Sequence, residues 1–135
     1  MSVWEKQAVE AAVLDALDAT HLNNLGGHHF GRPYVTAYQL AIAVDSAHPE
    51  IAQALGVSVG GRGAGAQNSL AQYLARELSA RIKRDGEGYP VEGAFVSNEH
   101  LTSLIYRNAD GQPITSSLTG TGFDLSLFRR RVQVQ

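Results

Sequence analysis

The amino-acid sequence predicts an α+β fold in which N-terminal helices are followed by a β-hairpin region. Three boxes of the form Ser/Thr-x-x-Glu/Gln lie within the first 72 residues, and each can satisfy free backbone amides at the start of a helix. Beyond residue 88 the composition changes to strand formers and turn pairs. The length of 135 residues fits one domain, so we expect residues 1–135 to fold together, with a helical part at about 3–84 and a β-rich part at about 89–130.

Four helices are expected, at 3–19, 36–47, 49–55 and 69–84. The first carries apolar residues at spacings of three and four, as an amphipathic helix does. The second and fourth begin at boxes, and the short third lies between Pro49 and Gly56, a first proline and a final glycine that are typical of helix ends. Loops are expected at 20–34 and 56–68, where glycine and polar residues are frequent.

Strands are expected in the last part of the chain, at 90–96, 101–107, 112–118 and 123–128. Asp110-Gly111 is a hairpin-turn signal between the second and third of them. Residues 97–103 are also compatible with a short helix. Residues 123–128 alternate apolar and polar side chains, which is typical of a half-buried strand.

The composition excludes several classes of protein. Apolar residues make up 44% and charged residues 18%, which is enough apolar surface for a core, and the net charge of -2 excludes a polycation. The absence of cysteine excludes disulfides, thiolate zinc sites and cysteine nucleophiles. No apolar run approaches the ~18 residues of a membrane span, and residues 1–10 lack the pattern of a signal peptide. We therefore expect a cytoplasmic protein without membrane association.

No catalytic residue, metal site or cofactor is expected. The sequence lacks a Gly-x-Ser-x-Gly elbow, a His-Glu-x-x-His motif and a Walker loop. His21, His28 and His29 match no metal-ligand spacing. The glycine-rich run at 60–65 has part of a dinucleotide fingerprint but lacks its βαβ unit, so a nucleotide site there is only an alternative hypothesis. A binding protein is favoured over an enzyme.

Charge is divided unevenly along the chain. Residues 1–61 carry two basic and six acidic side chains, whereas residues 62–84 carry five basic side chains and one acidic. At ~100° per residue, helix 69–84 has an apolar side and an opposite polar stripe. The stripe consists of Ser69, Gln72, Arg76, Ser79 and Lys83. The single acidic residue, Glu77, lies off the stripe and can pair with Arg81 at i, i+4.

This stripe has two interpretations. Glutamine can pair with adenine, arginine with guanine, and serine with phosphate, so the stripe suits a helix that reads a DNA major groove. Amphipathic helices also carry polar stripes as a matter of course, with basic residues favoured late in the helix by the macrodipole. The arrangement of the other elements favours the first interpretation.

This order of elements resembles that of the winged helix-turn-helix DNA-binding proteins: N-terminal helices, the cationic helix 69–84 and a hairpin around Asp110-Gly111. The resemblance covers about residues 3–118. It implies that helix 69–84 enters the major groove, that Arg107 beside the hairpin turn contacts the DNA backbone or minor groove, and that the protein is a dimeric transcriptional regulator. The 13 residues at 56–68 depart from the family's short turn between its paired helices, so either 57–59 forms a small strand or the paired helices are different ones.

Double-stranded DNA is accordingly the expected partner, bound by a homodimer. We expect Gln72 and Arg76 to contact bases. The phosphates are expected to be held by Arg62, Asn68, Ser69, Lys83 and Arg107. The alternative is a protein–protein interaction or adaptor module that uses the basic helix or the hairpin edge to hold an acidic partner, which the negative net charge keeps open.

Overall fold

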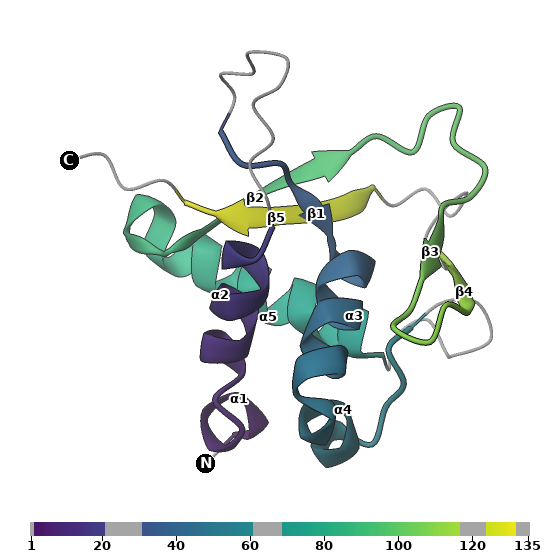
Figure 1. Ribbon diagram of the computed structural model, residues 1–135. Coiled ribbons are helices and arrows are strands. Elements are labelled where there is room, and N and C mark those ends of the chain that lie inside the picture. Colours follow the sequence, from purple (N-terminus) through teal and green to yellow (C-terminus); the bar gives the residue numbers. More distant parts are fainter. Residues whose placement is uncertain (1, 21–30, 61–68, 117–123, 132–135) are drawn as a thin grey trace.

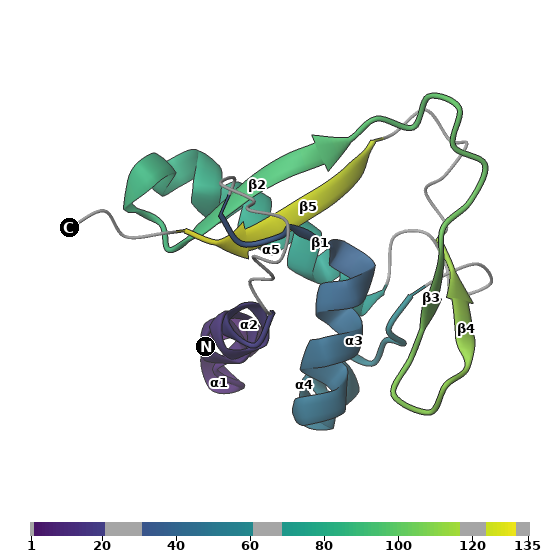
Figure 2. The same ribbon diagram turned by 45° about the horizontal axis from the view of Figure 1, so that its top comes forward.

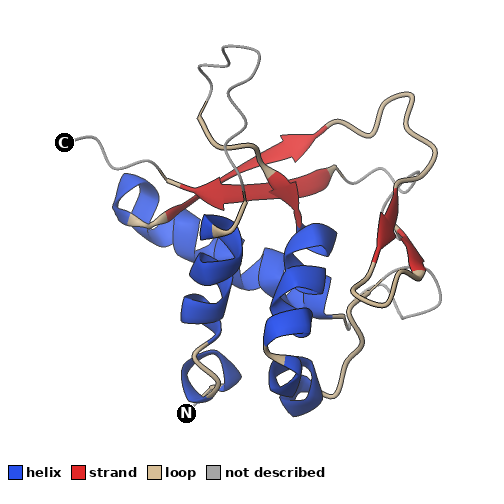
Figure 3. Ribbon diagram, in the orientation of Figure 1, coloured by secondary structure: helices blue, strands red, loops and turns tan. Residues whose placement is uncertain are grey.

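The structure is a computed structural model that describes residues 2–20, 31–60, 69–116 and 124–131. In these residues the helices gather below one face of a three-stranded antiparallel sheet (Figures 1 and 2). Helices come first in the chain, and most of the strands follow them (Figure 3). The predicted α+β class, with N-terminal helices and then antiparallel strands, is confirmed.

Five α-helices form in the described residues. They are α1 (Val3–Lys6), α2 (Val9–Asp18), α3 (Ala37–Ala47), α4 (Pro49–Leu55) and α5 (Leu70–Asp85), with a 3-10 turn at Gly86–Gly88. The expected ends of α3, α4 and α5 are confirmed within a residue. Thr36 and Gln39 form the full reciprocal box at the start of α3, and Gly56 ends α4 in the left-handed conformation with φ 69°.

The single helix expected at 3–19 is wrong, because the chain bends between α1 and α2. Ala8 adopts the left-handed conformation with φ 50°, which costs an L-residue roughly 1–2 kcal/mol. The bend lets both Trp4 and Val9 enter the core, where they are 6% and 0% exposed. Burial of the large tryptophan side chain offsets the strain at Ala8.

The main sheet has the order β1-β5-β2, from β1 (Val35–Thr36), β5 (Leu125–Arg130) and β2 (Val91–Val96). All neighbours are antiparallel, and Gly93 of β2 is paired with Phe128 of β5. Sequence reasoning missed β1, since a two-residue strand directly before a helix leaves no periodic signal. The strand expected at 90–96 is confirmed, and the last strand continues to Arg130, beyond the predicted end at 128.

A separate two-stranded sheet, β3 (Ile105–Arg107) and β4 (Pro113–Thr115), lies between β2 and β5 in the chain. The hairpin at Asp110-Gly111 is confirmed, but its loop is longer than a tight turn. Asn108 Oδ1 accepts hydrogen bonds from the amides of Asp110 and Gln112, at 3.0 and 2.8 Å. Residues 101–104 are not part of the expected strand, and the alternative short helix at 97–103 does not form.

One core connects the helices to the main sheet. Its fully buried large side chains are Leu17, Leu40, Ile51, Leu70, Leu74, Leu78 and Phe128. Gly93 allows α5 to lie close to the sheet, since a Cβ there would stand 3.4 Å from Ile82 Cδ1 and from the Leu127 carbonyl oxygen. Close approach of α5 to β2 and β5 fixes which side of α5 remains exposed.

We predict that Ala8→Gly stabilises the protein by roughly 1 kcal/mol, because glycine adopts the left-handed conformation without a Cβ clash. The matched control is Ala43→Gly, at an exposed position inside α3, which should destabilise by roughly 0.5–1 kcal/mol. Urea unfolding measures both changes. A loss of stability in the Ala8 variant would contradict the strain assigned to this bend.

Candidate nucleic-acid interface

Helix α5 carries most of the predicted DNA-contacting residues, and its orientation follows from its apolar side. Leu70, Ala71, Leu74 and Leu78 are buried, and α5 packs against both α3 and β2. The opposite side presents Arg76, Ser79 and Lys83 to solvent. The amphipathic pattern therefore predicted the exposure of these three residues correctly, but the first residue of the predicted stripe, Ser69, is buried and Gln72 is partly buried. The function of the exposed residues remains a prediction.

Arg76 and Lys83 are free cations within the described part of the chain, where neither forms an ion pair. They lie seven residues apart, which is about 10 Å along the axis of an α-helix. Both side chains are exposed, and no carboxylate of the described residues neutralises them. The two residues together form a small cationic surface.

The other two arginines of α5 are already engaged. Arg81 Nη1 donates to Glu77 Oε2 at 2.9 Å, and its guanidinium lies 3.9 Å from the centroid of the Trp4 ring. The Arg81–Glu77 ion pair is the i, i+4 pair expected from the sequence. Arg84 makes two hydrogen bonds to the Asp85 carboxylate, at 2.8 and 2.9 Å. The pairing with Arg84 lowers the pKa of Asp85, although both groups lie at the surface.

Ser69 caps α5 from a buried position. It is 5% exposed, and its hydroxyl oxygen accepts the backbone amide of Gln72 at 3.1 Å. A phosphate has little access to this hydroxyl, so the burial of Ser69 argues against its expected phosphate contact. Gln72 itself is partly buried. Arg62 and Asn68 lie outside the described residues, and their expected phosphate contacts remain predictions.

Arg107 lies on the small hairpin, away from the main sheet. It is exposed at the end of β3, where it is paired with Pro113. The hairpin is anchored to α3, because the rings of Tyr106 and Tyr38 stack with centroids 5.2 Å apart. The expected role of Arg107 therefore depends on a hairpin inserted between β2 and β5, which are themselves paired with each other.

An apolar groove of about 300 Å³ runs between α5 and the main sheet, beside the cationic surface. It is lined by Ser79, Ile82, Lys83, Gly93, Ala94, Phe95, Ser126 and Phe128. Phe95 stands at this groove with 70% of its surface exposed. Sequence reasoning missed Phe95, since an aromatic residue in a strand ordinarily indicates a core position. Lys83 belongs to both the groove and the free cations.

The outer face of the sheet holds a compact ion-pair cluster that uses two more arginines. Glu92 accepts hydrogen bonds from Arg129 at 2.7 Å, from Arg131 at 3.4 Å and from the Tyr34 hydroxyl at 3.3 Å. The pKa of Tyr34 is raised above its ordinary value, because burial and the nearby Glu92 carboxylate outweigh the opposing effect of Arg129. Arg130 points to the other face and pairs with Asp18 at 3.5 Å. The three consecutive arginines thus stabilise the fold and do not add to the cationic surface.

Comparisons with known proteins identify no relative. No family model, no curated protein and no solved structure matches the chain. Among the described residues, no three metal-ligating side chains come together, and no helix is long and apolar enough to cross a membrane. His21, His28 and His29 fall outside those residues.

We predict that the arginines of α5 differ in their contribution to the stability of the fold. Arg81→Ala should destabilise the protein by about 1–2 kcal/mol, because it removes the contact with Trp4 and the pair with Glu77. Arg76→Ala should change the free energy of unfolding by less than about 0.5 kcal/mol. Urea unfolding of the two variants checks this, and equal losses would show that Arg76 has a structural partner.

Proposed function

We propose that the protein binds double-stranded DNA through the exposed side of α5 and acts as a transcriptional regulator. The observation that carries this proposal is the pair of unneutralised cations, Arg76 and Lys83, on one exposed helix face of an otherwise acidic chain. A single α-helix fits the major groove, where an exposed arginine can pair with guanine. Lys83 lies two turns further along and would hold a phosphate.

The winged helix-turn-helix resemblance supports the same proposal. The strands β2 and β5 that follow α5 are antiparallel, and the hairpin β3–β4 inserted between them carries Arg107. In this arrangement α5 is the recognition helix, and the hairpin is the second contact with the duplex. Gln72 would contact a base from the partly buried first turn of α5. Arg62 and Asn68 precede α5 in the chain and remain proposed phosphate contacts.

We predict that the double variant Arg76→Ala/Lys83→Ala binds duplex DNA about tenfold or more weakly than the wild type. The dependence of log affinity on log salt should become shallower by about one for each lost phosphate contact. Fluorescence anisotropy on a random-sequence duplex, with salt varied from about 50 to 200 mM, measures both quantities.

The matched control is Lys6→Ala, which removes an exposed cation from α1 and leaves α5 intact. We expect its affinity and salt dependence to equal those of the wild type. Unchanged binding in the double variant would remove α5 from the interface. Equal losses in the control would mean that binding depends on overall charge and not on this surface.

A second candidate function, an adaptor that holds an acidic protein partner, is favoured by one observation. The groove beside Lys83 is mainly apolar, and Phe95 is exposed at it. The proposed contacts with DNA make no use of Phe95. Exposed aromatic residues next to a groove often anchor protein partners. Lys83 at the rim would attract a carboxylate of such a partner.

We predict for this candidate that Phe95→Ala abolishes capture of a stoichiometric protein partner, whereas Ile105→Ala does not. Ile105 is the matched control because it is 69% exposed, almost as much as Phe95, but lies on the other sheet. Affinity purification with both variants makes the comparison. Duplex binding that survives Phe95→Ala, with no partner recovered by the wild type, would eliminate the adaptor function.

A further inference from the structure

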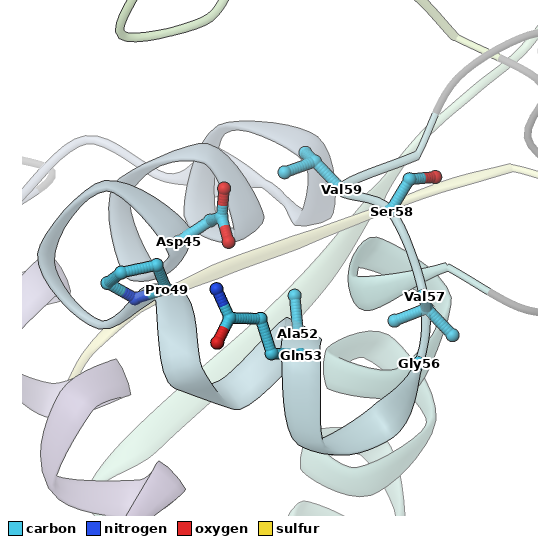
Figure 4. Close-up of a pocket in the computed structure, with 8 residues that line it drawn as sticks. All are labelled: Asp45, Pro49, Ala52, Gln53, Gly56, Val57, Ser58 and Val59. Carbon is cyan, nitrogen blue, oxygen red and sulfur yellow. The ribbon is translucent and has the colours of Figure 1, made fainter.

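A second pocket lies on a different part of the molecule, between the end of α3, helix α4 and the segment after it. Its volume is about 490 Å³, within the range of small-molecule sites. It is lined by Asp45, Pro49, Ala52, Gln53, Gly56, Val57, Ser58 and Val59. In Figure 4 the Asp45 carboxylate and the Gln53 amide both point into the pocket, and Val59 faces Asp45 from the opposite segment.

Asp45 is a carboxylate without a counter-ion in the described part of the chain. Residues 33–60 contain no lysine and no arginine, and the only histidine among them, His48, lies 3.3 Å from Glu50. Asp45 also lies in the last turn of α3, where the helix macrodipole disfavours a negative charge. Burial raises its pKa, and among the described residues no charged neighbour adds to that shift. Both effects disfavour the charged form of Asp45 in the folded protein.

The other residues that line the pocket indicate which kind of ligand would compensate the charge of Asp45. Pro49, Ala52, Val57 and Val59 give the pocket apolar walls, and Gln53 supplies one further polar contact. A divalent metal ion requires about six oxygen ligands, and a single carboxylate does not provide them. A positive charge attached to an apolar body matches both the carboxylate and the walls.

We propose that this pocket binds a small organic cation, a protonated amine on an apolar body, with the Asp45 carboxylate as its counter-ion. The Gln53 side chain accepts or donates a second hydrogen bond to the ligand. This inference goes beyond DNA binding and does not rest on it. It assigns a ligand site to the α3–α4 side of the molecule, separate from the exposed side of α5.

Isothermal titration calorimetry tests the site with phenethylamine and hexylamine at concentrations up to about 10 mM. The corresponding alcohols, which have the same apolar bodies without the charge, are the ligand-side controls. The wild type should bind the amines, and the alcohols should bind at least about tenfold more weakly. No binding of either amine, or equal binding of amines and alcohols, would overturn the proposal.

Asp45→Asn is the informative variant, because it keeps the shape of the side chain and removes the charge. It should weaken amine binding about tenfold or more, whereas Ser46→Ala, at the next exposed position of α3, should not change it. Equal amine affinity in Asp45→Asn and wild type would overturn the proposal. Neither variant should change duplex binding, so this test can fail without affecting the proposed DNA-binding function.

The same variant checks the premise that Asp45 is unpaired. Because the pKa of Asp45 is raised in the folded protein, the folded state holds its proton more tightly than the unfolded state. The stability of the wild type should then fall as the pH rises from the ordinary pKa of 3.8 through the raised pKa of the folded state. The stability of Asp45→Asn should not show this decrease, because asparagine does not titrate. Thermal unfolding at pH 4 and pH 7 should show the variant gaining stability over the wild type as pH rises. A stability difference between variant and wild type that stays the same at pH 4 and pH 7 would overturn the premise and the proposal.

Discussion

The packing of α5 against the sheet is the constraint on which the other features depend. Leu74 and Leu78 are fully buried, and the absence of a side chain at Gly93 lets Ile82 approach the strand pair β2–β5 closely. A rotation of α5 about its axis would expose these leucines at a cost of roughly 1.5–3 kcal/mol for each. The exposed side of the helix is therefore determined by the core, and the cations on it are presented in a fixed direction.

The same packing decides which basic side chains are available to a ligand. Arg81 lies on the flank of α5 that faces Trp4, so it stabilises the position of α1. Arg129 and Arg131 are held by Glu92, and Arg130 by Asp18. A charge count along the chain treats all these residues alike. The structure distinguishes them, because a partly buried arginine with a carboxylate partner is already neutralised, whereas Arg76 and Lys83 are not.

Local signals in the sequence predicted much of the fold. Caps and end residues such as Thr36, Pro49 and Gly56 act within a few residues of themselves, so their effects could be read directly. The bend at Ala8 could not be predicted, because it results from the fit of Trp4 into a core formed by distant segments. The pairing of Glu92 with Arg129 joins residues 37 positions apart, and no local pattern indicates it. The pocket at Asp45 was missed for the same reason. Its carboxylate is unusual because no basic side chain of the described residues pairs with it, and that depends on which distant segments surround it.

Two free cations on α5 place a limit on how the proposed DNA binding can work. Of the two, only Lys83 is proposed to hold a phosphate, so α5 contributes a salt slope of only about one, whereas proteins that bind tightly make about 6–10 such contacts. The acidic first 61 residues add repulsion at low salt and contribute no attraction. Tight duplex binding therefore requires further cations, and the chain offers Arg62 and Arg107 or a second copy of itself. A second copy would double the contacts, and dimers of helix-turn-helix proteins bind half-sites about one turn of DNA apart, which is the spacing that the expected homodimer would need. The small number of contacts that one copy offers, more than the identity of any one of them, therefore favours a dimer as the DNA-binding form.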